Sequence, residues 1–208
     1  MLRHILGLIA LLTAAAGVAQ VKTVRINVNG YFEAAVSDGP IRVTVNEQGR
    51  IAHIGMKGAV ERYPYTDMYG RGGWVSKVGG IVFDYYPGHD VQGRGGKLSR
   101  VGEITFDYYD KNDIFGRTGR LSRIGGVAFD YYDRSDIMGR SGRISRIGDC
   151  SIDYYPSGDL TGRDGKIRQI GSSTFDYAPQ SAFGGYGGRL SSGPAFFTER
   201  GIAFQIWE

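Results

Sequence analysis

The chain has 208 residues, of which 25 are Lys or Arg and 21 are Asp or Glu, so its formal net charge is only +4. Because the two signs alternate locally and form no basic block, the charge pattern argues against a nucleic-acid-binding surface. Glycine contributes 34 residues without the G-X-Y order of collagen, beside 14 Tyr and 10 Phe. Glycine between aromatic segments is typical of short β-strands joined by tight turns.

Residues 1–19 have the composition of a secretory signal peptide. Arg3 and His4 precede an apolar run at 5–12, and small residues follow up to Ala19. The run is shorter than the ~18 apolar residues of a membrane-spanning helix, and no later segment reaches that length. We therefore expect cleavage after Ala19, no transmembrane segment in the mature chain, and a secreted or periplasmic protein.

Residues 20–46 predict β-strands that cap one end of the fold. Asn29-Gly30 lies between two segments of alternating character, and this dipeptide is a strong hairpin signal. IRVTV at 41–45 predicts another strand. Because the outer edges of a repeat array lack neighbours, terminal segments are expected to differ from the units between them.

A period of 23 residues organises residues 47–192. The unit is G-R-x-G-[KR]-[LI]-S-R-[IV]-G-x-[IV]-x-F-D-Y-Y-x-x-x-D-[IVL]-x, and its last glycine before the strand recurs as Gly73, Gly96, Gly119, Gly142, Gly165 and Gly188. Gly49 precedes this series by 24 residues, and we expect the additional residue within 56–60. Residues 193–208 predict two closing strands that cap the other end.

Each unit predicts a β-hairpin, because Gly102-Glu103 and its equivalents suit a two-residue turn between the strand segments 97–101 and 104–109. Alternation of side chains predicts two faces. The expected core face carries Ser99, Val101, Ile104, Phe106 and Tyr108, and the expected outer face carries Leu98, Arg100, Thr105, Asp107 and Tyr109. On the outer face we expect diagonal ion pairs within each hairpin: Arg100 with Asp107, Arg123 with Asp130, and Arg146 with Asp153.

The predicted fold class is all-β, with tandem 23-residue hairpins forming an elongated or rolled antiparallel sheet. A β-solenoid with one parallel strand per coil is the alternative, since Leu98, Val101, Ile104 and Phe106 are spaced as in leucine-rich repeats. The Gly-x turns would have no role in such a coil, so the hairpins are favoured.

The order DYYD…GRxGRLSRIG…FDYYD resembles the YD repeats of Rhs-type bacterial surface and secreted proteins, over about residues 47–192. MORN repeats, another hairpin family, have a similar period. The resemblance implies a hairpin fold and carries no catalytic residue.

Candidate chemical groups are few. His53 and His89 lie out of repeat register without a Ser-His-Asp or Cys-His pattern, so we expect no enzyme and no cofactor. Cys150, the single cysteine, occupies an apolar column and is expected in the core. A weaker metal hypothesis assigns Ca²⁺ to the D-x-x-D-x-x-D runs: Asp107, Asp110, Asp113, Asp130, Asp133 and Asp136.

The leading binding candidates are the second tyrosines of the units and their neighbouring acids: Tyr86, Tyr109, Tyr132, Tyr155, Asp107 and Asp130. Phenol rings in a row, ~9.6 Å apart, are suited to stacking on sugars. The alternative is that these rings cover the next unit. We expect an extracytoplasmic scaffold that contacts cell-wall or surface polysaccharide, or a self-associating adhesin that binds protein partners.

Overall fold

The computed structural model describes residues 21–55, 58–179 and 188–208, and within them the chain is all-β, without helix. The signal-peptide prediction lies outside these residues, and so do 56–57 of the segment 56–60 in which the additional residue is expected. Two large sheets face each other, and a third sheet consists of the short strands β16 (Asp176–Tyr177) and β17 (Leu190–Ser192).

The larger sheet has eleven strands that lie side by side in chain order. They are β5 (Val60–Arg62), β6 (Val75–Val78), β7 (Ile81–Tyr85), β8 (Leu98–Val101), β9 (Ile104–Tyr108), β10 (Leu121–Ile124), β11 (Val127–Tyr131), β12 (Ile144–Ile147), β13 (Cys150–Tyr154), β14 (Ile167–Ile170) and β15 (Ser173–Thr174). All of its described strand pairs are antiparallel, unlike the parallel pairs of the solenoid alternative.

Two-residue turns join β8 to β9 and the equivalent strands of the other units. Val101 pairs with Ile104 and Arg100 with Thr105, in the register expected from the sequence. Gly102 adopts a φ of 54°, which is the left-handed conformation that these turns need.

The second sheet contains both ends of the described chain. Its order is β18-β19-β1-β2-β3-β4, and the bounds are β1 (Val21–Asn27), β2 (Phe32–Asp38), β3 (Ile41–Asn46), β4 (Ile51–Gly55), β18 (Phe196–Glu199) and β19 (Ile202–Trp207). The hairpin around Asn29-Gly30, the strand at 41–45 and the closing strand pair are all present. However, β1 pairs with β19 in parallel, so the two segments expected at opposite ends form one sheet instead.

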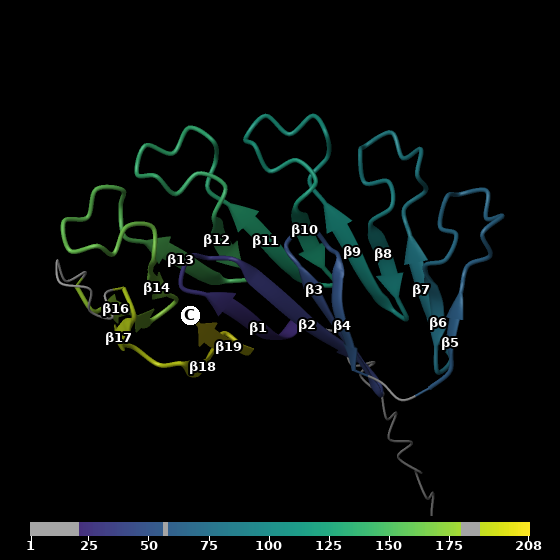
Figure 1. Ribbon diagram of the computed structural model, residues 1–208, viewed down its shortest axis with the longest axis horizontal. Helices are drawn as coiled ribbons and strands as arrows, with labels where there is room; N and C mark the ends of the chain where they lie inside the picture. The colour runs from purple at the N-terminus through teal and green to yellow at the C-terminus, as the bar shows by residue number, and fades with distance from the viewer. Residues whose placement is uncertain (1–20, 56–57, 180–187) are drawn as a thin grey trace, which may run out of the picture.

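This sheet lies in the concave side of the curved eleven-stranded sheet (Figure 1). A single apolar core contains buried residues from both sheets, and Phe32 of β2 stacks on Phe129 of β11 with ring centroids 5.4 Å apart. Cys150 is fully buried in this core, as expected, and burial raises the pKa of its thiol to about 11.

Two turns of the smaller sheet dock directly on the repeat units. The backbone N–H of Leu121 donates to the Glu47 carbonyl, and that of Ile167 donates to the Val28 carbonyl, each at 2.8 Å. Gly49, in the turn after β3, touches the Tyr108 ring so closely that a Cβ there would collide with it. Glycine is therefore required at this contact. Leu121 and Ile167 are two units apart, so the two turns bind alternate repeat units.

The two faces predicted for each unit need a correction at the start of its first strand. The register passes from Asp84 opposite Arg100 to Tyr85 opposite Leu98, so Ser99 is the additional residue of a β-bulge. Leu98 is consequently buried with Val101, and Ser99 is only partly buried. Strict alternation fails here because two residues on one strand oppose one on its neighbour.

The bulge also changes the partners of the strand arginines. Arg100 forms its ion pair with Asp84 of the preceding unit, and Arg146 lies 3.6 Å from Asp130. Arg123 lies directly opposite Asp107, again across the boundary between units. The expected pairs within a hairpin, such as Arg100 with Asp107, are not among the ion pairs of the described residues. These charges therefore link neighbouring units.

Candidate functional site

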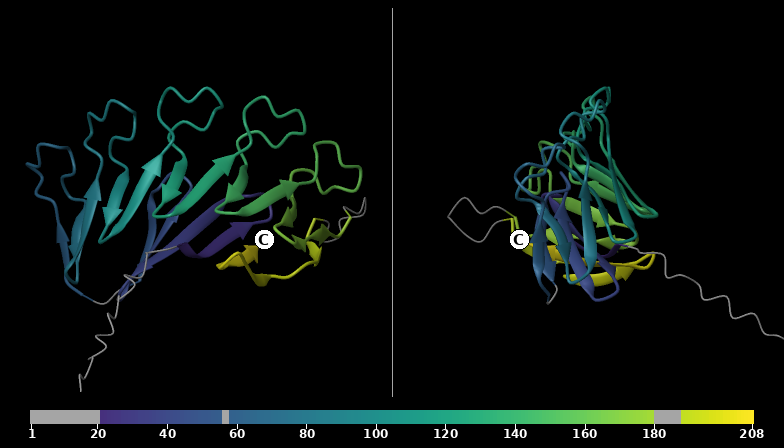
Figure 2. Two further views of the ribbon diagram at one scale, coloured as in Figure 1. Left: turned by 180° about the vertical axis from the view of Figure 1, so that it is seen from behind. Right: turned by 90° about the vertical axis from the view of Figure 1, so that its right-hand side faces the viewer.

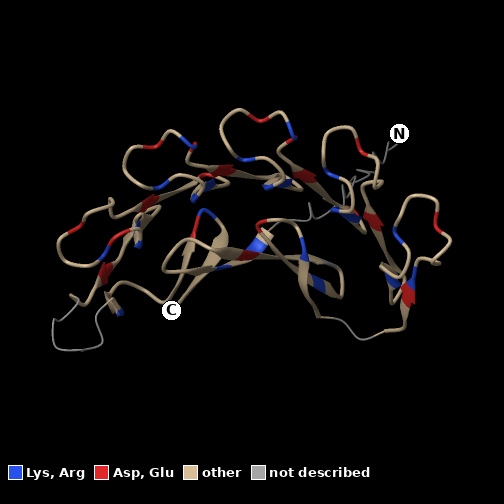
Figure 3. Ribbon diagram, turned by 45° about the horizontal axis from the view of Figure 1, so that its top comes forward, with Lys and Arg blue, Asp and Glu red and all other residues tan. Residues whose placement is uncertain are grey.

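Among the described residues, five loops project from the convex edge of the eleven-stranded sheet, at 64–73, 87–96, 110–119, 133–142 and 156–165. Seen end-on in Figure 2, they lie one behind another along one edge of the molecule. Each loop carries acidic and basic residues at equivalent places along the ribbon (Figure 3). Because the same residues recur in every loop, the third loop represents the set.

The loop aspartate fixes the conformation of its loop. The Asp113 Oδ1 accepts hydrogen bonds from the backbone N–H groups of Phe115, at 3.0 Å, and Arg117, at 2.9 Å. Arg117 donates from Nε and Nη2 to Oδ2 at 3.1 and 2.8 Å. The same ion pair joins Asp67 to Arg71, Asp90 to Arg94, Asp136 to Arg140 and Asp159 to Arg163.

These contacts also determine the charge state of the loops. The hydrogen bonds from Arg71 lower the pKa of Asp67 to about 2, and the equivalent arginines lower the pKa values of Asp90 and Asp136. The carboxylates therefore stay ionised at all physiological pH values, and each loop is held by a charge-assisted pair.

The loop arginine then reaches the next unit across a tyrosine. The Arg117 guanidinium lies 4.0 Å from the centre of the Tyr109 ring, and its Nη1 donates to the Asp130 carboxylate at 2.8 Å. Tyr109 donates its hydroxyl hydrogen to the carbonyl of Phe129, and its oxygen lies 3.1 Å from Asp130. Burial, followed by the charge of Asp130, raises the pKa of Tyr109 to about 12.

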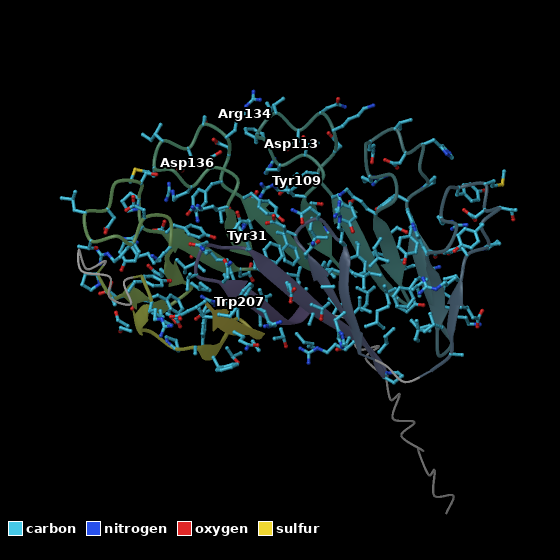
Figure 4. All side chains as sticks on the ribbon, viewed as in Figure 1. Tyr31, Tyr109, Asp113, Arg134, Asp136 and Trp207 are labelled. Atoms are coloured by element: carbon cyan, nitrogen blue, oxygen red, sulfur yellow. The ribbon has the colours of Figure 1, made fainter. Side chains whose placement is uncertain are left out.

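The sequence-predicted tyrosines thus share one kind of environment. Each donates its hydroxyl hydrogen to a backbone carbonyl twenty residues later, and each has a loop arginine over its ring: Tyr86, Tyr109, Tyr132 and Tyr155, with Tyr63 one period before Tyr86. All are partly buried. In Figure 4, Tyr109 lies below the loop that carries Asp113. The structure brings these tyrosines together with Asp107 and Asp130, but it uses their hydroxyls and one ring face for contacts between units.

The aspartates of the calcium hypothesis lie in separate contacts. Asp113 and Asp136 bind their loop arginines, and Asp107 and Asp130 bind arginines of the preceding loops. The remaining pair, Asp110 and Asp133, accept hydrogen bonds from the backbone two residues later. Within residues 21–55, 58–179 and 188–208, no three or more His, Cys, Asp or Glu side chains are grouped to hold a metal ion.

The two histidines outside the signal segment are also apart. His53 lies exposed on β4, and His89 lies exposed in the second loop, where its ring is 6.4 Å from that of Tyr69. Neither belongs to a nucleophilic or metal-binding arrangement in the described part of the chain.

The loops also present a row of apolar side chains to solvent, at a position that recurs in the sequence motif. The residue that follows each loop aspartate is aliphatic or Met and points into solvent; we name this set the tip column. Its relative exposures are 83, 79, 68, 94 and 102% for Met68, Val91, Ile114, Ile137 and Leu160, respectively. Three loops add an exposed neighbour: Tyr69, Phe115 and Met138.

Backbone hydrogen bonds hold the loops to one another as well. The N–H groups of Gly88, Lys111, Arg134 and Ser157 donate to carbonyls of the preceding loops at 2.9–3.1 Å. Together with the aspartate contacts, this ladder makes the loops an ordered row. The tip column is therefore a fixed, periodic apolar surface.

No protein-family model, curated protein or solved structure matches this chain. In the part of the chain that the structure describes, no helix is long and apolar enough to cross a membrane. The function is accordingly inferred from the surface of the molecule itself.

Proposed function

We propose that the chain is an exported, non-enzymatic scaffold of tandem 23-residue β-hairpins, which associates with protein surfaces, and first with other copies of itself, through the tip column. Export is supported by the signal-like residues 1–19. A scaffold role is supported by the repeated construction and by the separation of the candidate catalytic residues.

The observation that carries the proposal is the exposure of the tip column. The loops that carry these side chains are themselves held in place by hydrogen bonds and ion pairs. The polar groups of the loop motif are engaged within the chain, whereas Ile114, Ile137 and Leu160 are 68, 94 and 102% exposed. Isolated exposed apolar residues are ordinary, but a regular row of them marks an interaction surface.

A second copy fits this row because it has the same spacing. Successive loops start two strands apart, or ~9.6 Å, and because they spread outward from the convex edge (Figure 1), their tips recur at a regular spacing of at least that length. Two antiparallel rows with equal spacing can interdigitate about a twofold axis, so that one tip fits between two others. Since the loop edge is convex (Figure 1), the central tips Ile114 and Ile137 are expected to meet first. Burying each such side chain contributes about 1.5–3 kcal/mol before the cost of association.

Sedimentation velocity over a range of protein concentrations tests this proposal. We expect the chain to form dimers or larger species as concentration rises, and we expect the Ile114→Ser/Ile137→Ser variant to remain monomeric at the same concentrations. Circular dichroism checks that the variant is folded.

Phe196→Ser is the matched control, because Phe196 is 70% exposed but lies on β18, in the other sheet. This variant should associate as the parent does. A parent chain that stays monomeric at every concentration, or a control that loses association equally, would contradict the proposal.

A further inference from the structure

The first hairpin carries an aromatic residue at a position where the later hairpins carry a cation, and this residue lines a cavity. In four later units, the residue before the first strand is a cation that lies 5.0–5.5 Å from the ring centre of the inner tyrosine: Lys97, Arg120, Arg143 and Lys166. In the first unit this residue is Trp74. Its ring meets that of Tyr85 edge-on, with centroids 4.9 Å apart and planes at 61°.

Tyr85 also differs from the inner tyrosines of the later units. Tyr108, Tyr131, Tyr154 and Tyr177 donate their hydroxyl hydrogens to a backbone carbonyl ten residues earlier, at 2.8–3.1 Å. Among the described residues, Tyr85 makes no such bond. Its side chain is only partly buried, and its hydroxyl is not among buried polar atoms without a partner. The hydroxyl group of Tyr85 therefore remains accessible to a ligand.

The two rings line a cavity of about 370 Å³ between the first unit and the turn after β3. Its other walls are Gln48, Gly49, Arg50, Ile51, Gly95, Gly96, Lys97 and Leu98. The volume is within the range of small-molecule sites, and the lining combines aromatic and aliphatic surface with a few polar groups.

Two cations give the cavity its electrostatic character. Lys97 donates from Nζ to the Gln48 carbonyl at 3.2 Å, and Arg50 follows in the same turn. Burial, followed by the charge of Arg50, lowers the pKa of Lys97. An anion bound between these side chains would offset both effects, since it favours the charged form of the amine.

We propose that this cavity binds an acidic saccharide. The C–H face of a sugar ring fits against the Trp74 indole, its hydroxyls can exchange hydrogen bonds with Tyr85, and its carboxylate can pair with Lys97 and Arg50. The site is separate from the tip column and does not depend on self-association. It also differs from the outer tyrosines, whose hydroxyls are already bonded within the chain.

Tryptophan fluorescence offers a direct test, because the chain contains only two tryptophans. In a Trp207→Phe background, Trp74 is the single reporter. We expect trigalacturonate to change its emission saturably, and we expect the neutral trisaccharide of galactose to bind at least about tenfold more weakly, as loss of one charge-assisted contact predicts. Citrate provides an anion without a sugar ring.

Lys97→Met in the same background should weaken trigalacturonate binding by about tenfold, while Lys111→Met, at an exposed loop position, should leave it unchanged. Calorimetry with Trp74→Ala tests the stacking surface, and circular dichroism confirms that each variant is folded. The inference would be overturned if trigalacturonate caused no saturable change, if Lys97→Met bound it as tightly as the parent, or if citrate bound equally well.

Discussion

The inner face of the eleven-stranded sheet and its loop edge come from the same 23-residue motif, yet they use apolar residues in opposite ways. On the inner face, Leu121, Ile124 and Phe129 are at most 1% exposed. On the loop edge, Ile137 and Leu160 are 94 and 102% exposed. The first set produces the fold, because the second sheet removes it from water. The second set contributes nothing comparable to folding and is therefore available to a partner.

Polar groups divide between the two regions in the same manner. On the inner face, the Tyr131 hydroxyl satisfies the Leu121 carbonyl inside the core. At the loop edge, Arg117 joins Asp113 to Asp130 across two units. One set of bonds satisfies buried groups, and the other fixes the loops that present the tips. Substitutions on the inner face should therefore lower the free energy of unfolding, whereas substitutions at the tips should weaken self-association.

The largest expected effect is in the core. Phe129→Ala removes a ring that stacks on Phe32, so it should lower the free energy of unfolding by about 3–5 kcal/mol. Equilibrium unfolding in urea measures this loss. Phe129→Leu should cost clearly less, because it leaves a smaller void. A loss of less than about 1 kcal/mol from Phe129→Ala would show that the two sheets do not depend on this contact.

The loop arginine should have an intermediate effect. Arg117→Met removes two charge-assisted pairs from a side chain that is only 19% exposed, and we expect a loss of about 1–3 kcal/mol. Arg134→Met, at an exposed position in the next loop, is the control and should change stability by less than about 0.5 kcal/mol. If both variants have the same stability, the contact between units is not stabilising.

The loop aspartates predict sensitivity to acid. The pKa of Asp67 is about 2 in the folded chain against an ordinary 3.8, so folding favours the ionised carboxylate. This contribution is fully present above about pH 4 and is lost as pH falls towards 2. The midpoint of urea unfolding should therefore decrease over this interval, and less so in the Asp67→Asn variant. An identical decrease in both proteins would assign the acid effect to other groups.

The smallest effect on stability is expected at the tips. Ile137→Ser should change the free energy of unfolding by less than about 0.5 kcal/mol, because the side chain is already 94% exposed. The same variant should weaken self-association in sedimentation experiments. A large loss of stability instead would mean that the tip packs within the chain and is no free surface.

Much of the fold follows from the pattern of residues, and so does the composition of the loops. The Gly-x turns and the hairpin register were predictable because glycine reaches the required positive φ without steric cost, as at Gly102. The burial of Leu98 was not predictable, because the β-bulge at Ser99 changes the alternation of side chains and serine gives no sequence signal for a bulge. The tip column was visible as the aliphatic position after each loop aspartate, but its exposure could not be distinguished from burial by sequence alone.

The sequence by itself determined most of the strands and the two-residue turns, because these depend on residues close together in the chain and recur at a fixed spacing. Only the tertiary structure decided that β1 pairs with β19, that the resulting sheet covers the concave side, and that the first unit keeps Trp74 and Tyr85 beside an open cavity. Those outcomes depend on contacts between distant segments, for which local alternation and turn chemistry carry no information. The same hairpin motif can therefore be covered at one unit and open at another.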